Sequence, residues 1–159
     1  MATIKGKIKA ISISAKKGTK KTNVPEAELK IDFGIVGDAH GGNWHRQISL
    51  LSIESIDKMV AMGAKVSPGN FAENITTEGI ELPKLPIGSR LKVGGGIELE
   101  VTQIGKECHS KCEISKQVGD CIMPREGIFT KVTKNGLIKI GDIIEVLDDQ
   151  EHSHKQSAR

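Results

Sequence analysis

The chain is poor in aromatic residues: among 159 residues there are three Phe, one Trp and no Tyr. The hydrophobic core must therefore consist of Ile, Val and Leu, and the β-branched members of this set favour strands. Proteins that hold single-stranded nucleic acid stack its bases on aromatic side chains, and this sequence offers few of them. The net charge of +3 is also too small to indicate nucleic-acid binding on its own. We expect no nucleic-acid partner.

Long apolar runs are missing as well. No stretch approaches the roughly 20 apolar residues that a membrane helix requires, and the N-terminal residues are charged and amphipathic rather than signal-like. The three cysteines are an odd number in a chain without an export signal. This combination favours reduced thiols over disulfides. We expect a cytoplasmic protein with no membrane partner.

The length suits one domain. We assign it to residues 1–147 and expect the polar tail, residues 148–159, to be disordered. Eighteen glycines and five prolines predict many short strands joined by turns. Alternating or apolar segments predict strands at residues 3–14, 29–35, 47–51, 71–76, 90–93, 97–104, 127–133, 137–140 and 143–147. So many short strands favour a closed or nearly closed β-barrel, which hides strand edges.

One helix is predicted after residue 52. Ser52 is a suitable N-cap, an acidic residue follows in the first turn, and Gly63 is a suitable stop. Its apolar residues are predicted to share one face: Ile53, Ile56, Met59 and Val60.

All three cysteines lie in residues 105–129, GKECHSKCEISKQVGDCIMPREGIF. Neighbouring cations favour the thiolate, the form that attacks sulfur or binds metal. Cys112, which follows a lysine, is the preferred functional thiol, and Cys108 is the second candidate. A zinc site is imperfect here, because a fourth ligand at His109 would be adjacent to Cys108. The alternative is that one or two of the cysteines are small buried hydrophobic residues.

A second candidate segment is residues 37–46, GDAHGGNWHR, which contains the only Trp. Its glycines let the backbone approach a ligand closely, and Arg46 can bind an oxyanion with two parallel hydrogen bonds. His40 and His45 are further candidates. The alternative is a turn whose His and Arg cap strand ends, and Asp38 is interpreted as structural.

Three more polar segments are candidates. In residues 68–74, Asn70, Glu73 and Asn74 are candidate cofactor-binding residues, since Glu73 and Asn74 open a predicted strand and can aim a carboxylate and an amide into a pocket. The alternative is that the Pro-Gly-Asn turn needs no function. Arg125 lies near the thiols, where it suits an anionic cofactor, unless it simply pairs with Glu126. The lysine loop, residues 16–21, either faces a phosphate-bearing ligand or is solvated.

Taken together, the segments GDAHGGNWHRQISLLS, PGNFAENITTEGIEL, LPIGSRLKVG and GKECHSKC…GDCIMPREGIF…GLIKIGDIIEV resemble the MOSC domain, named for the C-terminal domain of molybdenum cofactor sulfurase. The chain is similar to the short free-standing bacterial form. The resemblance implies a mainly β, barrel-like fold and a role in binding the molybdenum cofactor (molybdopterin) or passing sulfur to it. It also implies that chemistry using pyridoxal phosphate belongs to a desulfurase-like domain outside this polypeptide. In related amidoxime-reducing enzymes a cysteine ligates molybdenum, and Cys112 fits that element best, with Cys108 as the alternative.

Three functions follow, in order of preference. The first is a cofactor-binding or sulfur-carrier protein in cofactor maturation or delivery, with a cysteine desulfurase or a molybdoenzyme as partner. Cys112 would then ligate metal or carry a persulfide, and Arg46, Arg125 and the lysine loop would hold phosphate. The second is a small molybdenum-dependent reductase of N-hydroxylated compounds, and the third is a zinc-stapled interaction domain. We expect Cys108 and Cys112 to share one cleft with His40, His45 and Arg46. A homodimer formed by pairing of strand edges is a separate possibility that no sequence feature decides.

Overall fold

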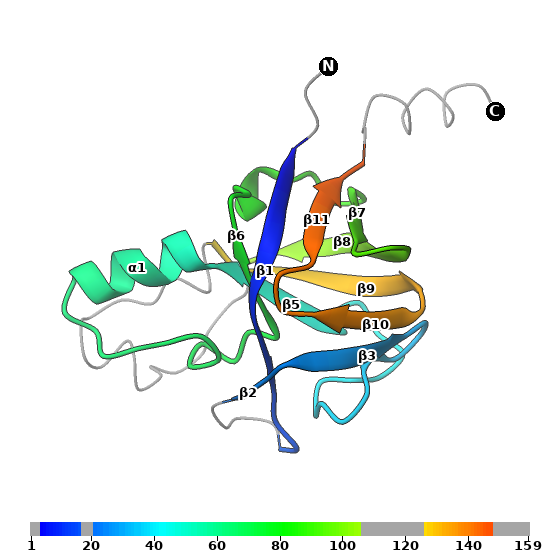
Figure 1. The fold of residues 1–159 in the computed structure, drawn as a ribbon, viewed down its shortest axis with the longest axis horizontal. Helices are drawn as coiled ribbons and strands as arrows, with labels where there is room; N and C mark the ends of the chain where they lie inside the picture. The colour runs from blue at the N-terminus through cyan, green and yellow to red at the C-terminus, as the bar shows by residue number, and fades with distance from the viewer. Residues whose placement is uncertain (1–3, 17–20, 106–125, 148–159) are drawn as a thin grey trace.

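The structure, a computed structural model, describes residues 4–16, 21–105 and 126–147. Cys108, Cys112, Cys121 and Arg125, together with the polar tail, lie outside the described residues. Most of the described chain is β-structure, as the sequence predicts (Figure 1).

Seven strands form a closed barrel, which confirms the predicted fold class. Around the barrel the order is β1 (Lys5–Ile13), β11 (Ile143–Val146), β7 (Arg90–Val93), β8 (Ile97–Ile104), β9 (Ile128–Lys134), β5 (Ile48–Ser52), β6 (Ile75–Glu78) and β1 again. Every neighbouring pair is antiparallel except β5 and β6, which are parallel. The far end of β1 also pairs with β2 (Thr22–Val24). Closure leaves none of the seven strands with an unpaired edge along the barrel wall.

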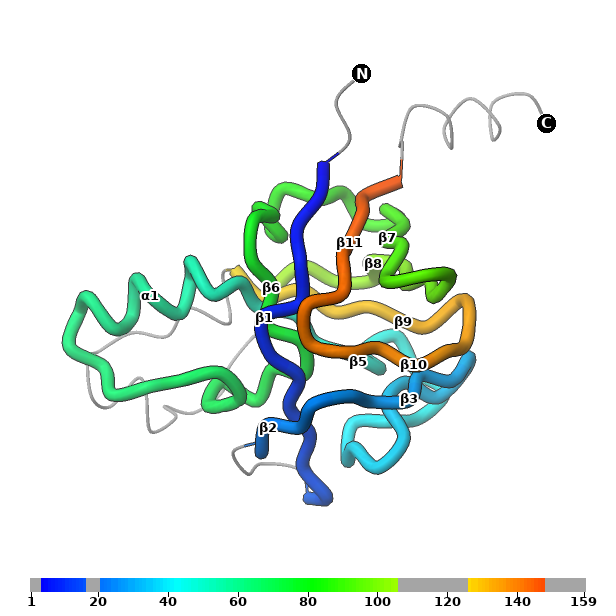
Figure 2. The backbone as a smooth tube through the Cα atoms, viewed as in Figure 1, coloured from blue at the N-terminus to red at the C-terminus, as the bar shows by residue number. Residues whose placement is uncertain are grey.

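A small second sheet lies beside the barrel. It consists of β10 (Gly136–Lys139), β3 (Glu26–Lys30) and β4 (Gly34–Ile35), with β3 in the middle. Figure 2 shows β3 and β10 running side by side next to β9. The chain leaves this sheet at β4 and reaches β5 of the barrel through the loop of residues 36–47.

The core has two parts. The main hydrophobic cluster of the barrel is aliphatic, with Ile11, Leu50, Leu91 and Val101 fully buried. A smaller cluster lies between the helix and the barrel and contains Phe129 and other buried side chains, namely Leu51, Ile56, Met59, Ala64 and Phe71. Each buried Leu, Ile or Val stabilises the fold by about 1.5–3 kcal/mol relative to an exposed one. The shortage of aromatics is therefore met by branched aliphatic packing.

Among the described residues there is one α-helix, α1 (Ile53–Ala61), and one short 3-10 helix, η1 (Leu82–Lys84). The Ser52 hydroxyl accepts a hydrogen bond from the backbone N–H of Ser55 at 3.0 Å, which confirms the predicted N-cap. Val60 was expected on the buried face but is 48% exposed. Successive helical residues are rotated by about 100°, so Val60 lies a quarter turn beyond buried Met59 and outside the contact stripe.

Two predicted strands are interrupted. The strand expected at residues 29–35 is split into β3 and β4 by a turn in which the Phe33 N–H donates to Lys30 O and Asp32 has a φ of 61°. The strand expected at residues 71–76 begins only at Ile75. The Glu73 carboxylate accepts hydrogen bonds from the backbone of Gly69 and Phe71, which curls the chain before β6.

Candidate functional site

The loop of residues 36–47 is fixed to the barrel by a buried ion pair. Asp38 Oδ1 accepts from Lys21 Nζ at 2.7 Å and from the backbone N–H of Ser14, at the end of β1, at 3.0 Å. Asp38 Oδ2 accepts from the backbone N–H of His40 at 3.1 Å. Both charged side chains are 0% exposed. Asp38 is structural, as the sequence indicates.

The charge of Asp38 is strongly favoured by these contacts. Burial acts to raise its pKa, but the contacts from His40, Lys21 and Ser14 outweigh burial and hold the pKa well below its usual range. Lys21 is correspondingly unavailable for the phosphate contact expected of the lysine loop. Of that loop, residues 17–20 lie outside the described residues.

His40 continues this buried network toward the surface. Its Nδ1 lies 3.0 Å from Lys21 Nζ and 3.7 Å from Asp38 Oδ2, and its side chain is 28% exposed. The two distances place the ring directly against the ammonium group.

Trp44 is the centre of the loop of residues 36–47, which is called the Trp44 loop below. Its indole N–H donates to the backbone oxygen of His40 at 2.8 Å, and its ring meets the His45 ring edge-on with centroids 6.0 Å apart. The guanidinium carbon of Arg46 lies 4.8 Å from the Trp44 ring centroid and 5.5 Å from that of Phe129. One aromatic side chain thus contacts all three candidate residues of the loop, His40 through its backbone and His45 and Arg46 through their side chains.

Arg46 has unused hydrogen-bonding capacity. Its Nε is buried and has no hydrogen-bond partner, and no ion pair to it is found among the described residues. A buried N–H without an acceptor costs about 1–3 kcal/mol, and more when the group is charged. The two aromatic contacts hold the guanidinium in place while leaving its donors available. The role of Arg46 in binding an oxyanion stays a prediction.

His45 connects the loop to the end of β8. Its Nε2 lies 2.8 Å from Gln103 Oε1, and the Gln103 side-chain amide donates to Gly105 O at 2.7 Å. The Thr102 hydroxyl donates to the backbone oxygen of His45. His45 is thereby tied to the last described residue before the cysteine-bearing segment.

The two ends of that segment meet. The Gly105 N–H donates to Gly127 O at 2.7 Å, and Ile104 is paired with Ile128 in the β8–β9 ladder. Cys108 follows Gly105 by three positions in the sequence. The shared cleft of Cys108 and Cys112 with the histidines stays a prediction, because both cysteines lie outside the described residues.

Glu73 and Asn74 have internal partners. The fully buried Glu73 carboxylate accepts from Gly69 N at 2.9 Å, Phe71 N at 3.2 Å and Thr76 Oγ1 at 2.9 Å. Burial raises its pKa, although these hydrogen bonds act to lower it. These contacts hold the loop before β6, and a role for Glu73 in cofactor binding stays a prediction.

Asn74 bridges two strands, since its Oδ1 accepts from Ser49 N and its Nδ2 donates to Ser12 O. Asn70 Oδ1 accepts from Ser67 N at 3.1 Å within the same turn. For these two residues as well, cofactor binding stays a prediction.

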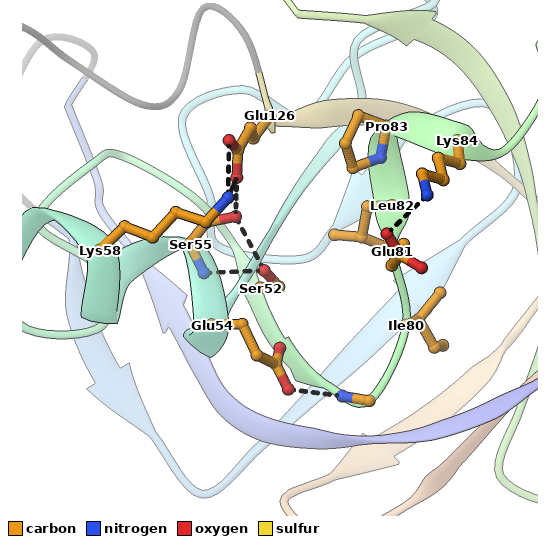
Figure 3. Close-up of a pocket in the computed structure, with 11 residues that line it drawn as sticks. Ser52, Glu54, Ser55, Lys58, Ile80, Glu81, Leu82, Pro83, Lys84 and Glu126 are labelled. Atoms are coloured by element: carbon orange, nitrogen blue, oxygen red, sulfur yellow. Dashed lines mark hydrogen bonds and ion pairs between the residues drawn. The ribbon is translucent and has the colours of Figure 1, made fainter.

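A cavity of about 480 Å³ lies at the N-terminal end of α1, and sequence reasoning did not single it out. Figure 3 shows Lys58 and Ser55 pointing toward Glu126, whose carboxylate accepts from Ser55 Oγ at 2.6 Å and from Lys58 Nζ at 3.0 Å. Across the cavity Glu81 pairs with Lys84 at 3.0 Å. No sequence motif indicates this cavity, because its walls come from the start of α1, from η1 with the residues before it, and from Glu126, which precedes β9. The sequence interpretation had considered Glu126 only as a partner of Arg125.

Comparison with known proteins identifies the family. The MOSC domain model matches residues 37–145, which is more than half of the chain and includes the Trp44 loop, the cysteine segment and most of the barrel. The chain belongs to the MOSC domain family. Members of this family are generally linked to the molybdenum cofactor. None of the curated proteins compared matches the sequence significantly.

Solved structures share the MOSC fold. The YuaD protein from Bacillus subtilis has a TM-score of 0.77 at 22% identity, with 91% of this chain and 97% of that chain covered. YiiM from Geobacillus stearothermophilus has a TM-score of 0.66 at 17% identity, covering 90% and 75%. YiiM from Escherichia coli has a TM-score of 0.61 at 16% identity, covering 89% and 70%. At these identities the similarity establishes the fold alone.

The described residues contain no group of three or more His, Cys, Asp or Glu side chains arranged to hold a metal ion. Within the same residues, no helix has the length and apolar character needed to cross a membrane.

Proposed function

We propose that this MOSC protein binds the molybdenum cofactor at the Trp44 loop and acts in its maturation or delivery. Arg46 holds the phosphate of the molybdopterin, and Cys112 ligates the metal or carries a persulfide, with Cys108 as the alternative thiol. The protein works in the cytoplasm with a cysteine desulfurase or a molybdoenzyme as its partner.

The buried, unpartnered Nε of Arg46 carries this proposal. A ligand that supplies anionic oxygens removes the cost of the buried, unpartnered Nε, and phosphate, like carboxylate, has a geometry that matches two parallel N–H donors. Stacking between Trp44 and Phe129 limits the rotamers of the long side chain before the ligand arrives. Less conformational entropy is then lost on binding.

The position of the cysteine segment supports a sulfur ligand at the same end of the barrel. Both ends of the segment meet at the Gly105–Gly127 hydrogen bond, and His45 is linked to Gly105 through Gln103. Soft thiolates suit molybdenum centres. When bound, the cofactor supplies a metal centre that accepts sulfur ligands, while this chain supplies the anion-binding donors and the thiol.

The test is cofactor retention after purification from cells that make the cofactor. Molybdenum content and pterin fluorescence are measured for the parent protein, Arg46→Gln, Cys112→Ser and Arg90→Gln. Arg90 is the matched control, since it is an exposed arginine on β7 and does not belong to the loop of residues 36–47. We expect retention to fall at least tenfold in Arg46→Gln and Cys112→Ser and to be unchanged in Arg90→Gln.

Parent protein that carries neither molybdenum nor pterin contradicts the proposal. Equal retention in Arg46→Gln and Arg90→Gln contradicts the assignment of the phosphate to Arg46. Full retention in Cys112→Ser together with loss in Cys108→Ser moves the sulfur role to Cys108.

A further inference from the structure

The hydrogen atoms of the Lys21 ammonium group are all accounted for. Its Nζ lies 2.7 Å from Asp38 Oδ1, 3.0 Å from His40 Nδ1 and 3.3 Å from Ser14 Oγ. An ammonium group has three donors and no lone pair. Three potential acceptors therefore match three N–H groups, in a position where the Lys21 side chain is 0% exposed.

This arrangement fixes which His40 nitrogen carries the proton. Lys21 must be charged, because a neutral amine would leave the buried Asp38 carboxylate without its counter-ion. A charged Lys21 can only donate to Nδ1, so Nδ1 must offer its lone pair. The other neighbour, Asp38 Oδ2, is 3.7 Å from Nδ1, which is too far for a hydrogen bond, so the His40 side chain favours the Asp38 charge only as a neighbouring polar group.

We propose that the buried Lys21–Asp38 pair locks His40 as the neutral imidazole with its proton on Nε2, so that His40 presents a hydrogen-bond donor to the ligand of the Trp44 loop. Lys21 and Asp38 are positioning residues: they act through His40 and do not touch the ligand. The ring is 28% exposed, and no hydrogen bond to Nε2 is found among the described residues. A base or a metal ligand at Nε2 is excluded by this assignment, because both roles need a lone pair there.

The class of ligand follows from the two donors on the loop. The backbone of His40 and the guanidinium of Arg46 both contact Trp44, and both residues offer N–H groups without an acceptor. A ligand rich in acceptor oxygens, such as a phosphate monoester, satisfies both. The identity of the ligand rests on the proposed function and deepens it. The position of the proton on the His40 ring does not depend on that function.

The decisive measurement is the tautomer of His40 in the ligand-free protein. Two-bond ¹H–¹⁵N correlation spectra distinguish a protonated from an unprotonated ring nitrogen, and the His40→Gln variant assigns the signals. At neutral pH we expect an unprotonated Nδ1 and a protonated Nε2. Rapid averaging of the two tautomers, or a protonated Nδ1, overturns the proposal without the need for any folded variant of the ion pair.

Lys21→Met then tests the cause. Removing the ammonium group should release the lock, so that both His40 tautomers become populated. His45 serves as an internal control, since its Nε2 contact with Gln103 is independent of Lys21. A second control is Lys92→Met, which changes an exposed lysine on β7. An unchanged His40 pattern in folded Lys21→Met overturns the role of the pair.

Inorganic phosphate serves as the ligand probe. In the parent protein, phosphate should shift the His40 Nε2 signal, and Arg46→Gln should weaken that response at least fivefold while leaving the tautomer intact. No response at millimolar phosphate contradicts the donor role of His40. The proposed cofactor function can fail separately, through absent molybdenum and pterin, while the His40 tautomer remains as assigned.

Discussion

Asp38 shows how much one residue of this loop depends on its surroundings. Its carboxylate neutralises a buried lysine, caps the end of β1 and anchors the backbone of His40. The sequence indicates a structural aspartate in a Gly-Asp turn. It does not reveal that the partner is Lys21, because the two residues are 17 positions apart and their contact is not a local one.

Asp38→Asn should destabilise the protein by about 3 kcal/mol at neutral pH, because it leaves Lys21 charged and buried without a counter-ion. The lowered pKa of Asp38 means that its contribution is present above the unfolded value of 3.8 and is lost as pH falls below that value. Urea unfolding across the acid range should therefore show a smaller pH dependence in the variant. Asp57→Asn, on the exposed face of α1, is the control and should differ from the parent by less than about 0.5 kcal/mol. Equal stability of the two variants would contradict the argument.

Glu73 has the opposite pKa direction. Burial raises its pKa, so the folded state holds its proton more tightly than the unfolded state, and this group's contribution weakens as pH rises above the usual glutamate value. Removing the whole acceptor is nevertheless costly, because three donors point at it. Glu73→Ala should lower the free energy of unfolding by about 3 kcal/mol, measured by urea titration at neutral pH. Glu26→Ala is the control, because Glu26 is an exposed residue of β3. A Glu73→Ala variant as stable as that control would refute the loop-anchoring role of Glu73.

Helices and strands that depend on a local sequence pattern were predicted correctly. The α1 helix was predicted through its serine cap and apolar spacing, and β7 and β8 were predicted at their observed residues. The failures at residues 31–33 and 71–74 have one cause: apolar residues continue through a turn. In the second case a buried carboxylate bends the backbone, and hydrophobic periodicity carries no signal for such side-chain contacts. The site is similar: Arg46 and the histidines were predictable as polar residues of a glycine-rich loop, whereas their order around Trp44 was not.

The N-cap of α1 gives a direct test at this scale. Ser52→Ala removes the acceptor for the Ser55 N–H and a partner of the Ser55 hydroxyl, and should cost about 1 kcal/mol of unfolding free energy. Thermal and urea unfolding measure it. Ser67→Ala changes an exposed serine and should have no measurable effect. A loss no greater than that of Ser67→Ala would show that the cap contributes nothing here.

For the whole molecule, β1 is the strand that closes the barrel. This strand pairs with β11 at one end, with β6 along its middle and with β2 at the other end. Gly6 lies at the crossing, where a Cβ atom would come within 2.4 Å of Glu78 O and 2.6 Å of Ile80. The sequence predicted the closed barrel from the number of short strands. It could not predict this crossing, because a glycine inside an alternating strand does not specify its neighbours.

Gly6→Ala should therefore destabilise the fold by about 2 kcal/mol or more, because the added methyl group meets backbone that cannot move away without opening the barrel. Gly95→Ala is the matched control, since nothing lies within 4 Å of a Cβ there. Comparison of the two midpoints in urea decides the matter. Similar midpoints would mean that β1 and β6 can separate freely.

The hydrogen bond between Gly105 and Gly127 also determines how this protein can change over evolution. Because Ile104 and Ile128 are ladder partners, the entire cysteine-bearing stretch is, in topological terms, the connection of a single hairpin. The entropic cost of closing such a connection rises only slowly with its length, by about 0.6 kcal/mol for each doubling of the number of residues. We therefore expect insertions, deletions and exchanged thiols in this stretch to leave the strand order and the Lys21–Asp38 anchor intact. Under the proposed function, the thiol can then diversify while the scaffold and the Trp44 loop are inherited unchanged.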